Sequence, residues 1–189
     1  MYKIAILGPE STGKTVLAES LAKHYNSLWV PEYAREYIEQ LNRPYTYDDV
    51  CCIAQKQIEQ ENYSVSRALS EKAKYVFFDT DLIITKVWFE HLYKQVPEFV
   101  TEHLKNGFFD YYLLCSPDLP WEPDAVREHG HDREFFFKWY QREIELLEKP
   151  YGIVSGVGEK RLQCAIEILS PLNPPRGTLQ TMKKISKTF

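Results

Sequence analysis

The chain has 189 residues, of which 44% are hydrophobic and 26% are charged, and its formal net charge is −4. This length and composition suit one globular domain that buries its own core, and the acidic balance argues against a nucleic-acid-binding surface. No apolar run reaches the roughly 18 residues of a membrane span, no signal peptide precedes the first apolar segment, and no Cys-x-x-Cys pair occurs, so we expect a cytoplasmic protein with free thiols.

The most informative stretch is residues 8–15, Gly-Pro-Glu-Ser-Thr-Gly-Lys-Thr, which matches the phosphate-binding pattern G-x-x-x-x-G-K-S/T. Residues 2–7 form an apolar run typical of a buried strand, and apolar residues recur at helical spacing after the loop. This order places backbone N–H groups and the positive end of a helix against a phosphate. The residues expected to bind nucleotide are Gly8, Glu10, Ser11, Thr12, Gly13, Lys14 and Thr15. Lys14 is expected at the β- and γ-phosphates of ATP, and the Thr15 hydroxyl on Mg²⁺.

A second strand is expected at residues 27–30, followed by Pro-Glu-Tyr-Ala-Arg-Glu at 31–36. This hexapeptide stands at the carboxyl end of the strand, the edge of an open α/β sheet that faces the ligand crevice. Glu32 and Arg35 are therefore candidate substrate contacts. The alternative is a solvated helix start, where a glutamate is favoured by the helix dipole alone.

Two helices follow. A short one is predicted over residues 34–41. Thr46 and Asp49 then resemble a capping box at the start of a long helix that runs to about residue 72. The polar face of the long helix is rich in Gln and Glu, which indicates a solvated surface.

Residues 75–78 are four apolar residues that run directly into Asp79. This pattern predicts a buried parallel strand that ends in a Walker-B-type aspartate, the carboxylate that holds Mg²⁺ beside the phosphate loop. Asp79 and Thr15 are therefore the expected metal-binding residues. Asp81 lies at the same end and is expected to contact the acceptor, with capping of the next helix as an alternative or additional role.

A segment with three prolines follows the fourth predicted strand, residues 111–115, and leads to Arg127 and Arg133. Two arginines on such a long loop are typical of a lid, which we expect over about residues 117–134. Closed over the triphosphate, they would neutralise charge that develops on the γ-phosphoryl group. A surface loop with ordinary salt bridges is the alternative.

The strands and helices alternate to the end of a fifth strand at 151–154 and a closing helix at 158–169. This alternation predicts an α/β fold of three layers, with a five-stranded parallel sheet, helices on both faces and right-handed crossovers. We expect a P-loop domain over residues 1–170. The remainder, 171–189, has three prolines, four basic residues and no acidic one, and we expect it to be extended.

Several classes of nucleotide-binding protein share these parts. A GTPase needs an N-K-x-D motif, which the sequence lacks, and a remodelling ATPase generally needs a longer chain. A small kinase needs a phosphate loop, a carboxylate on the acceptor side and a basic lid, and all three are predicted. The remaining alternatives are another nucleoside or deoxynucleoside kinase and a regulatory module or ATPase that binds nucleotide without phosphorylating an acceptor.

Four motifs at 8–15, 31–36, 78–85 and 119–127 together resemble the ribosylnicotinamide kinase domain of the NadR-like bifunctional regulators of bacterial NAD biosynthesis. The resemblance covers roughly residues 3–170. It implies a P-loop kinase that transfers the γ-phosphate of ATP to the 5′-hydroxyl of nicotinamide riboside, giving nicotinamide mononucleotide. It also implies ATP and Mg²⁺ roles for Lys14, Thr15 and Asp79, acceptor roles for Glu32, Arg35 and Asp81, and lid roles for Arg127 and Arg133. Family members often carry an adenylyltransferase domain before the kinase domain, whereas this sequence begins at the strand that leads into the phosphate loop.

Aromatic residues give the pyridinium substrate separate support, because a cationic ring is bound well between aromatic faces with carboxylates nearby. Tyr33 and Trp88 lie in the segments expected to form the crevice, and we take them as candidate substrate contacts. Packing in the core is the alternative for each of these rings.

Overall fold

The computed structural model of the chain describes residues 1–123 and 132–172. The strands are β1 (Tyr2–Leu7), β2 (Leu28–Val30), β3 (Tyr75–Asp79), β4 (Tyr111–Cys115) and β5 (Tyr151–Val154). The helices are α1 (Lys14–Tyr25), α2 (Tyr33–Glu39), α3 (Tyr47–Ser70), α4 (Leu82–Tyr93), α5 (Glu98–Lys105), α6 (Arg133–Leu146) and α7 (Glu159–Leu169), with a short 3₁₀ helix η1 (Ser170–Leu172). No helix within these ranges is both long and apolar enough to cross a membrane.

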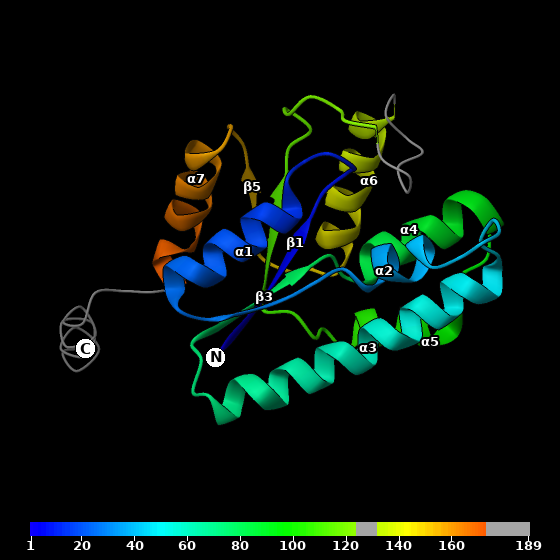
Figure 1. Ribbon diagram of the computed structural model, residues 1–189, viewed down its shortest axis with the longest axis horizontal. Coiled ribbons are helices and arrows are strands. Elements are labelled where there is room, and N and C mark those ends of the chain that lie inside the picture. Colours follow the sequence, from blue (N-terminus) through cyan, green and yellow to red (C-terminus); the bar gives the residue numbers. More distant parts are fainter. Residues whose placement is uncertain (124–131, 173–189) are drawn as a thin grey trace, which may run out of the picture.

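The five strands form one parallel sheet in the order β2-β3-β1-β4-β5 (Figure 1). The central strand β1 pairs with β3 on one side and β4 on the other, in a register that sets Ile6 opposite Asp79. The phosphate loop leaves the carboxyl end of β1, so the last residue of β3 stands beside it. The parallel α/β sheet predicted from the sequence is confirmed.

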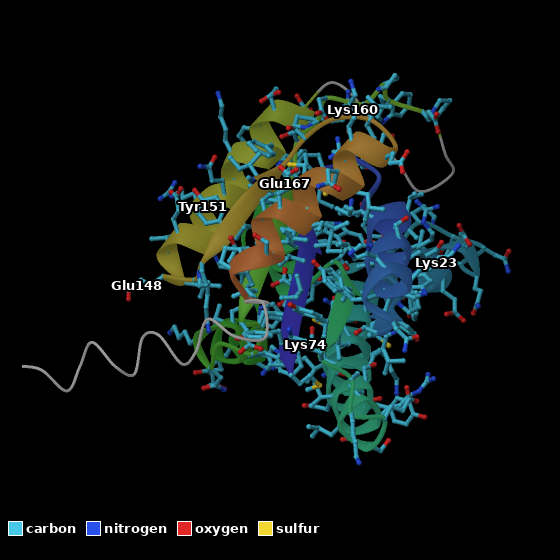
Figure 2. All side chains as sticks on the ribbon, turned by 90° about the vertical axis from the view of Figure 1, so that its left-hand side faces the viewer. Lys23, Lys74, Glu148, Tyr151, Lys160 and Glu167 are labelled. Carbon is cyan, nitrogen blue, oxygen red and sulfur yellow. The ribbon has the colours of Figure 1, made fainter. Side chains whose placement is uncertain are left out.

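Helices cover both faces of the sheet, which gives three layers (Figure 1). Because side chains alternate along a strand, Ile4 and Ile6 pack with α1 and α7, whereas Ala5 and Leu7 pack with the group of helices α3 to α6. Figure 2 shows α1 and α7 side by side on the first of these faces. The two apolar clusters hold the sheet between them and fix its carboxyl edge.

Helix boundaries follow the local signals in the sequence. α1 begins after Gly13, whose φ of 71° a glycine adopts without strain, and it ends at Asn26, which is also left-handed. α3 begins with the predicted capping box, in which the Thr46 hydroxyl accepts from the Asp49 N–H and the Asp49 carboxylate accepts from the Thr46 N–H.

The polar face of α3 was predicted to be solvated, and for its central residues that prediction is wrong. Gln57 and Glu61 are buried. A carboxylate oxygen of Glu61 lies 2.8 Å from Nε2 of His103 on α5, and the Thr85 hydroxyl of α4 donates to Gln57 at 3.5 Å. α3 packs against α4 and the sheet, so these polar groups pair with one another, apart from Glu61 Oε1, which is buried without a hydrogen-bond partner among the described residues.

Two predicted segments fall partly outside the described residues. Residues 124–131 of the predicted lid lie outside them, Arg127 included. Of the predicted tail, 171–189, the structure describes residues 171 and 172, which belong to η1.

Candidate active site

The phosphate loop is a tight turn between β1 and α1 that only glycine allows at two points. A Cβ on Gly8 would come within 2.8 Å of the Cys115 carbonyl oxygen and of Thr12 Oγ1, and Gly13 has a positive φ. The buried Thr12 hydroxyl donates to the Pro9 carbonyl oxygen at 2.8 Å, which closes the loop internally. The loop therefore sits preformed at the start of α1, where it can bind an anionic phosphate.

Lys14, Thr15 and Asp79 meet at the base of this loop. Lys14 Nζ donates to the Pro9 carbonyl oxygen at 3.0 Å, and the Thr15 hydroxyl donates to Asp79 Oδ2 at 2.5 Å. Burial raises the pKa of the Asp79 carboxyl, and the nearby Lys14 ammonium opposes that rise. The sequence prediction that brings these three residues together agrees with the structure.

The Thr15 and Asp79 pair fits a magnesium ion. The buried Oδ1 of Asp79 has no hydrogen-bond partner among the described residues, which leaves it available to an ion or to the ion's water. Those residues contain no cluster of three or more metal-binding side chains. Mg²⁺ is commonly held by one or two carboxylates together with substrate phosphates, so a sparse donor set of hard oxygens suits it.

A single cavity of about 890 Å³ joins the phosphate loop to a largely apolar chamber. One end is lined by residues 8–16. The far end is lined by Tyr45, Trp88, Tyr93 and Phe136, so aromatic rings contributed by α4, α6 and the loop after α2 form its wall. The volume is within the range of small-molecule sites and leaves room for an acceptor beside a triphosphate.

Glu32 and Arg35 both line this cavity, as the sequence predicted. Glu32 directly precedes α2, in the crevice that faces the phosphate loop. Loss of water around its partly exposed carboxyl raises the pKa of Glu32, while the cations Lys14 and Arg35 oppose the rise. The chain thus sets a carboxylate of weakened acidity within electrostatic reach of the residue expected at the γ-phosphate.

Trp88 also lines the cavity, with its ring edge-on to Tyr45 at 4.8 Å between centroids. Tyr33 does not. It opens α2 with its ring against Tyr37, 6.1 Å between centroids, whereas Ala34, Arg35 and residues one turn later form the cavity wall. Successive residues at the start of a helix point to different sides, so Glu32 lines the cavity whereas its neighbour Tyr33 does not.

Asp81 is not at the cavity either. It is fully buried and caps α4, with Oδ1 accepting from the Ile83 N–H at 2.8 Å. Burial raises the pKa of Asp81 to about 8. The structure agrees with the capping alternative, and the expected contact with the acceptor finds no support in this position because the side chain points into the core.

The two described ends of the predicted lid are anchored close to the phosphate loop. Trp121 Nε1 donates to the Glu10 carboxylate at 3.3 Å, and the Glu122 N–H donates to the Ser11 hydroxyl at 3.1 Å. At the other end, Arg133 donates to the Leu119 carbonyl oxygen at 2.8 Å. Arg133 therefore braces the base of the lid and does not line the cavity in this arrangement.

Arg161 supports the site and was missed by sequence reasoning. It is buried, forms an ion pair with Asp118, and donates to the carbonyl oxygens of Val154 at 3.1 Å and Ser116 at 3.2 Å. These contacts tie α7 to the ends of β4 and β5 and to the first turn of the lid. An arginine on an amphipathic helix gives no signal of this role before the chain is folded.

Arg43 and Asp49 form a second unpredicted support, at the aromatic end of the cavity. The guanidinium of Arg43 binds both carboxylate oxygens of Asp49, at 2.6 and 2.9 Å, and the Tyr37 hydroxyl donates to the same carboxylate at 2.9 Å. Hydrogen bonds from Arg43 and Thr46 hold the pKa of Asp49 well below its usual range. The network fixes the loop between α2 and α3, which forms one wall of the chamber.

Comparison with known proteins supports the resemblance drawn from the four motifs. The chain is similar to the trifunctional NAD biosynthesis/regulator protein NadR of Escherichia coli (strain K12), with 30% identity over 152 residues, and of Salmonella typhimurium (strain LT2), with 28% over 141 residues. These matches cover 77% and 70% of this chain but only 35% and 33% of the relatives. The chain thus spans about a third of the length of the curated relatives it matches.

Solved structures of NadR proteins are also similar to this chain. A NadR protein in complex with NR has a TM-score of 0.67 and 27% identity, over 90% of this chain and 51% of that one. A NadR protein in complex with NAD and AMP-PNP has a TM-score of 0.61 and 28% identity, over 90% and 49%. Thymidylate kinase from Ehrlichia chaffeensis shares the fold, with a TM-score of 0.59 and 13% identity over 91% of this chain and 98% of that one.

A protein-family model described as AAA domain matches residues 3–161, which include most of β1, the phosphate loop, Asp79 and the support residue Arg161. The match extends over most of the chain, and the chain therefore belongs to this AAA domain family.

Proposed function

We propose that the chain is an ATP-dependent kinase that phosphorylates the 5′-hydroxyl of nicotinamide riboside to give nicotinamide mononucleotide, in the cytoplasm. The observation that carries the proposal is one cavity lined by Lys14, Thr15 and Glu32 at one end and by aromatic side chains at the other, with Asp79 hydrogen-bonded to Thr15 just behind the phosphate end. The NadR structures, one with NR and one with NAD and the ATP analogue AMP-PNP, support the same pair of substrates.

The phosphate end suits transfer through positioning and charge rather than covalent chemistry. The loop and Lys14 would bind the β- and γ-phosphates, and Thr15 with Asp79 would hold Mg²⁺. When bound, Mg²⁺ neutralises part of the phosphate charge. Glu32 would accept a hydrogen bond from the acceptor hydroxyl, orient its oxygen towards the γ-phosphorus and take its proton. Arg133, with Arg127 outside the described residues, would bring positive charge through the lid.

The chamber suits the nicotinamide ring of the acceptor. Trp88 and Tyr45 present aromatic surface to a cationic ring, and Glu32 and Glu39 add negative charge to the same cavity. The arginine Arg43, which lines the same cavity, favours a neutral nucleobase instead, since an unpaired cation would repel a pyridinium. Pairing with Asp49 weakens that repulsion, so another nucleoside kinase activity is the second candidate and not the first.

A nucleoside panel tests the proposed function. We expect kcat/KM for nicotinamide riboside to exceed that for uridine, cytidine or thymidine by roughly tenfold or more, because a desolvated cation–π contact is worth on the order of 2 kcal/mol. ADP release from the full chain, followed with each nucleoside, measures this. A higher kcat/KM for a neutral nucleoside than for nicotinamide riboside would contradict the proposed acceptor but would leave the proposed kinase activity in place. The absence of nucleoside-stimulated ADP release would leave a nucleotide-binding module.

Asp79 gives a second prediction. Asp79→Asn should raise the Mg²⁺ concentration for half-maximal rate by roughly tenfold or more, since one oxygen donor and its negative charge are lost while the shape is kept. Titration of Mg²⁺ at saturating ATP measures the shift. Asp48→Asn, on the exposed first turn of α3, is the matched control and should titrate like the parent. Coincident curves for Asp79→Asn and the parent would make Asp79 a structural residue.

A further inference from the structure

Tyr140 is a cavity residue that neither the sequence motifs nor the proposed mechanism uses. It lies in the middle of α6, its side chain is only 7% exposed, and it lines the cavity together with Glu10 and Glu32. Its ring stacks on Phe136 one turn earlier, with 6.2 Å between centroids. Tyr140 therefore borders the same cavity as Glu10 of the phosphate loop and the proposed acceptor carboxylate Glu32.

Among the described residues the phenolic hydroxyl of Tyr140 has no hydrogen-bond partner, although the hydroxyl of a largely buried tyrosine usually has one. Burial raises the pKa of Tyr140, and the carboxylates of Glu10 and Glu32 raise it further. The hydroxyl consequently stays protonated at any physiological pH. It is a hydrogen-bond donor that lines the same cavity as Glu10 and Glu32, near enough for the charge of both carboxylates to act on it.

Packing fixes the position of this donor. Phe136 and Ile144, one turn on either side of Tyr140, are buried on the same face of α6. Lys86 of α4 donates to the buried Glu143 carboxylate at 2.6 Å, which ties α6 to α4 less than one turn beyond Tyr140. A group held by both packing and an ion pair loses little entropy when it binds a ligand.

We propose that the Tyr140 hydroxyl donates a hydrogen bond to a sugar hydroxyl of the acceptor and, with Glu32, positions the acceptor for phosphoryl transfer. This proposal rests on the proposed function, and it assigns to the cavity a requirement for a ribosyl-type acceptor rather than for a flat base alone. Glu32 accepts a hydrogen bond from the sugar, whereas Tyr140 supplies one, so the two side chains can hold one polyhydroxylated ring from complementary sides.

The test is Tyr140→Phe, which keeps the ring and its stacking and removes one oxygen. We expect kcat/KM for the acceptor to fall roughly fivefold to tenfold, the value of one neutral hydrogen bond, mostly through a higher KM. KM for ATP should stay within about twofold of the parent, and the melting temperature should not fall, because no hydrogen bond within the protein is lost. Tyr75→Phe is the matched control, since it removes a buried hydroxyl that also lacks a partner but lies at the opposite end of β3 from the cavity.

Two results would overturn the role of Tyr140: an acceptor kcat/KM within about twofold of the parent, or an equal loss for ATP and acceptor together with a lower melting temperature. The parent is assayed in the same series, which separates this proposal from the proposed function. If the parent prefers another nucleoside, that nucleoside becomes the acceptor in the Tyr140→Phe comparison. If the parent phosphorylates no nucleoside, both proposals fail.

Discussion

Lys14→Ala is expected to lower kcat/KM for phosphoryl transfer by on the order of 10²-fold or more. The Lys14 ammonium lies at the phosphate loop, 3.0 Å from the Pro9 carbonyl oxygen, and is close enough to Asp79 and Glu32 to oppose the rise in both their pKa values. Charge on the transferred group spreads over its peripheral oxygens in the transition state, and alanine offers nothing to meet it. Steady-state rates with varied ATP and acceptor measure the loss.

Lys23→Ala is the control for this change. Lys23 lies on the exposed side of the last turn of α1, away from the loop (Figure 2). Its removal should leave the rate within about twofold of the parent, since an exposed surface charge contributes little. Near-normal turnover in Lys14→Ala would show that the phosphate loop does not take part in phosphoryl transfer. Weakened ATP binding with an unchanged kcat would instead limit Lys14 to ground-state binding.

The fold could be predicted because its signals are local. The apolar run before Asp79 predicts a buried strand, the loop motif predicts its own strand and helix, and Thr46 with Asp49 predicts the start of α3; the structure contains all three. Alternation of strands and helices then leaves few topologies open, because parallel connections are right-handed. The motif residues of the phosphate end were found for the same reason, since a loop of eight residues carries most of its own geometry.

The acceptor end could be predicted only in part, because it is assembled from separate elements. Tyr33 follows Glu32 directly in the sequence, yet Glu32 lines the cavity while the Tyr33 ring packs against Tyr37. Asp81 lies two residues after Asp79, yet its side chain caps α4. Only the folded chain shows which of these side chains faces the cavity. Tyr140 reaches the site through the packing of α6 on α4, and Arg161 through α7 on β4 and β5. Glu61 looks like a surface residue until α5 brings His103 to it. Contacts of this kind have no signature in a single sequence.

Glu32→Gln is expected to lower kcat by on the order of 10²-fold while KM for ATP stays within about twofold of the parent. Glutamine keeps the shape and can still accept a hydrogen bond, but it cannot take the proton of the acceptor hydroxyl. The contact with ATP belongs to the loop and Lys14, so the nucleotide should bind as before. Glu36→Gln is the matched control, because Glu36 lies four residues later, within α2, but is exposed and does not line the cavity.

The pH dependence separates a base from a residue that only orients the acceptor. Burial raises the pKa of Glu32 above its ordinary value of 4.5. A base must be deprotonated, so the parent's activity should be present above this raised pKa and lost as the pH falls through it, on the acid side of the profile. Glu32→Gln has no carboxylate to protonate and should lack that acid limb, with a low and flat rate in the same range. Rates of parent and variant across this pH range, at saturating ATP and Mg²⁺, measure the difference. A variant that keeps the acid limb would assign the titration to another carboxylate, such as Asp79, whose charge acts on Glu32, and Glu32 would then orient the acceptor without taking its proton.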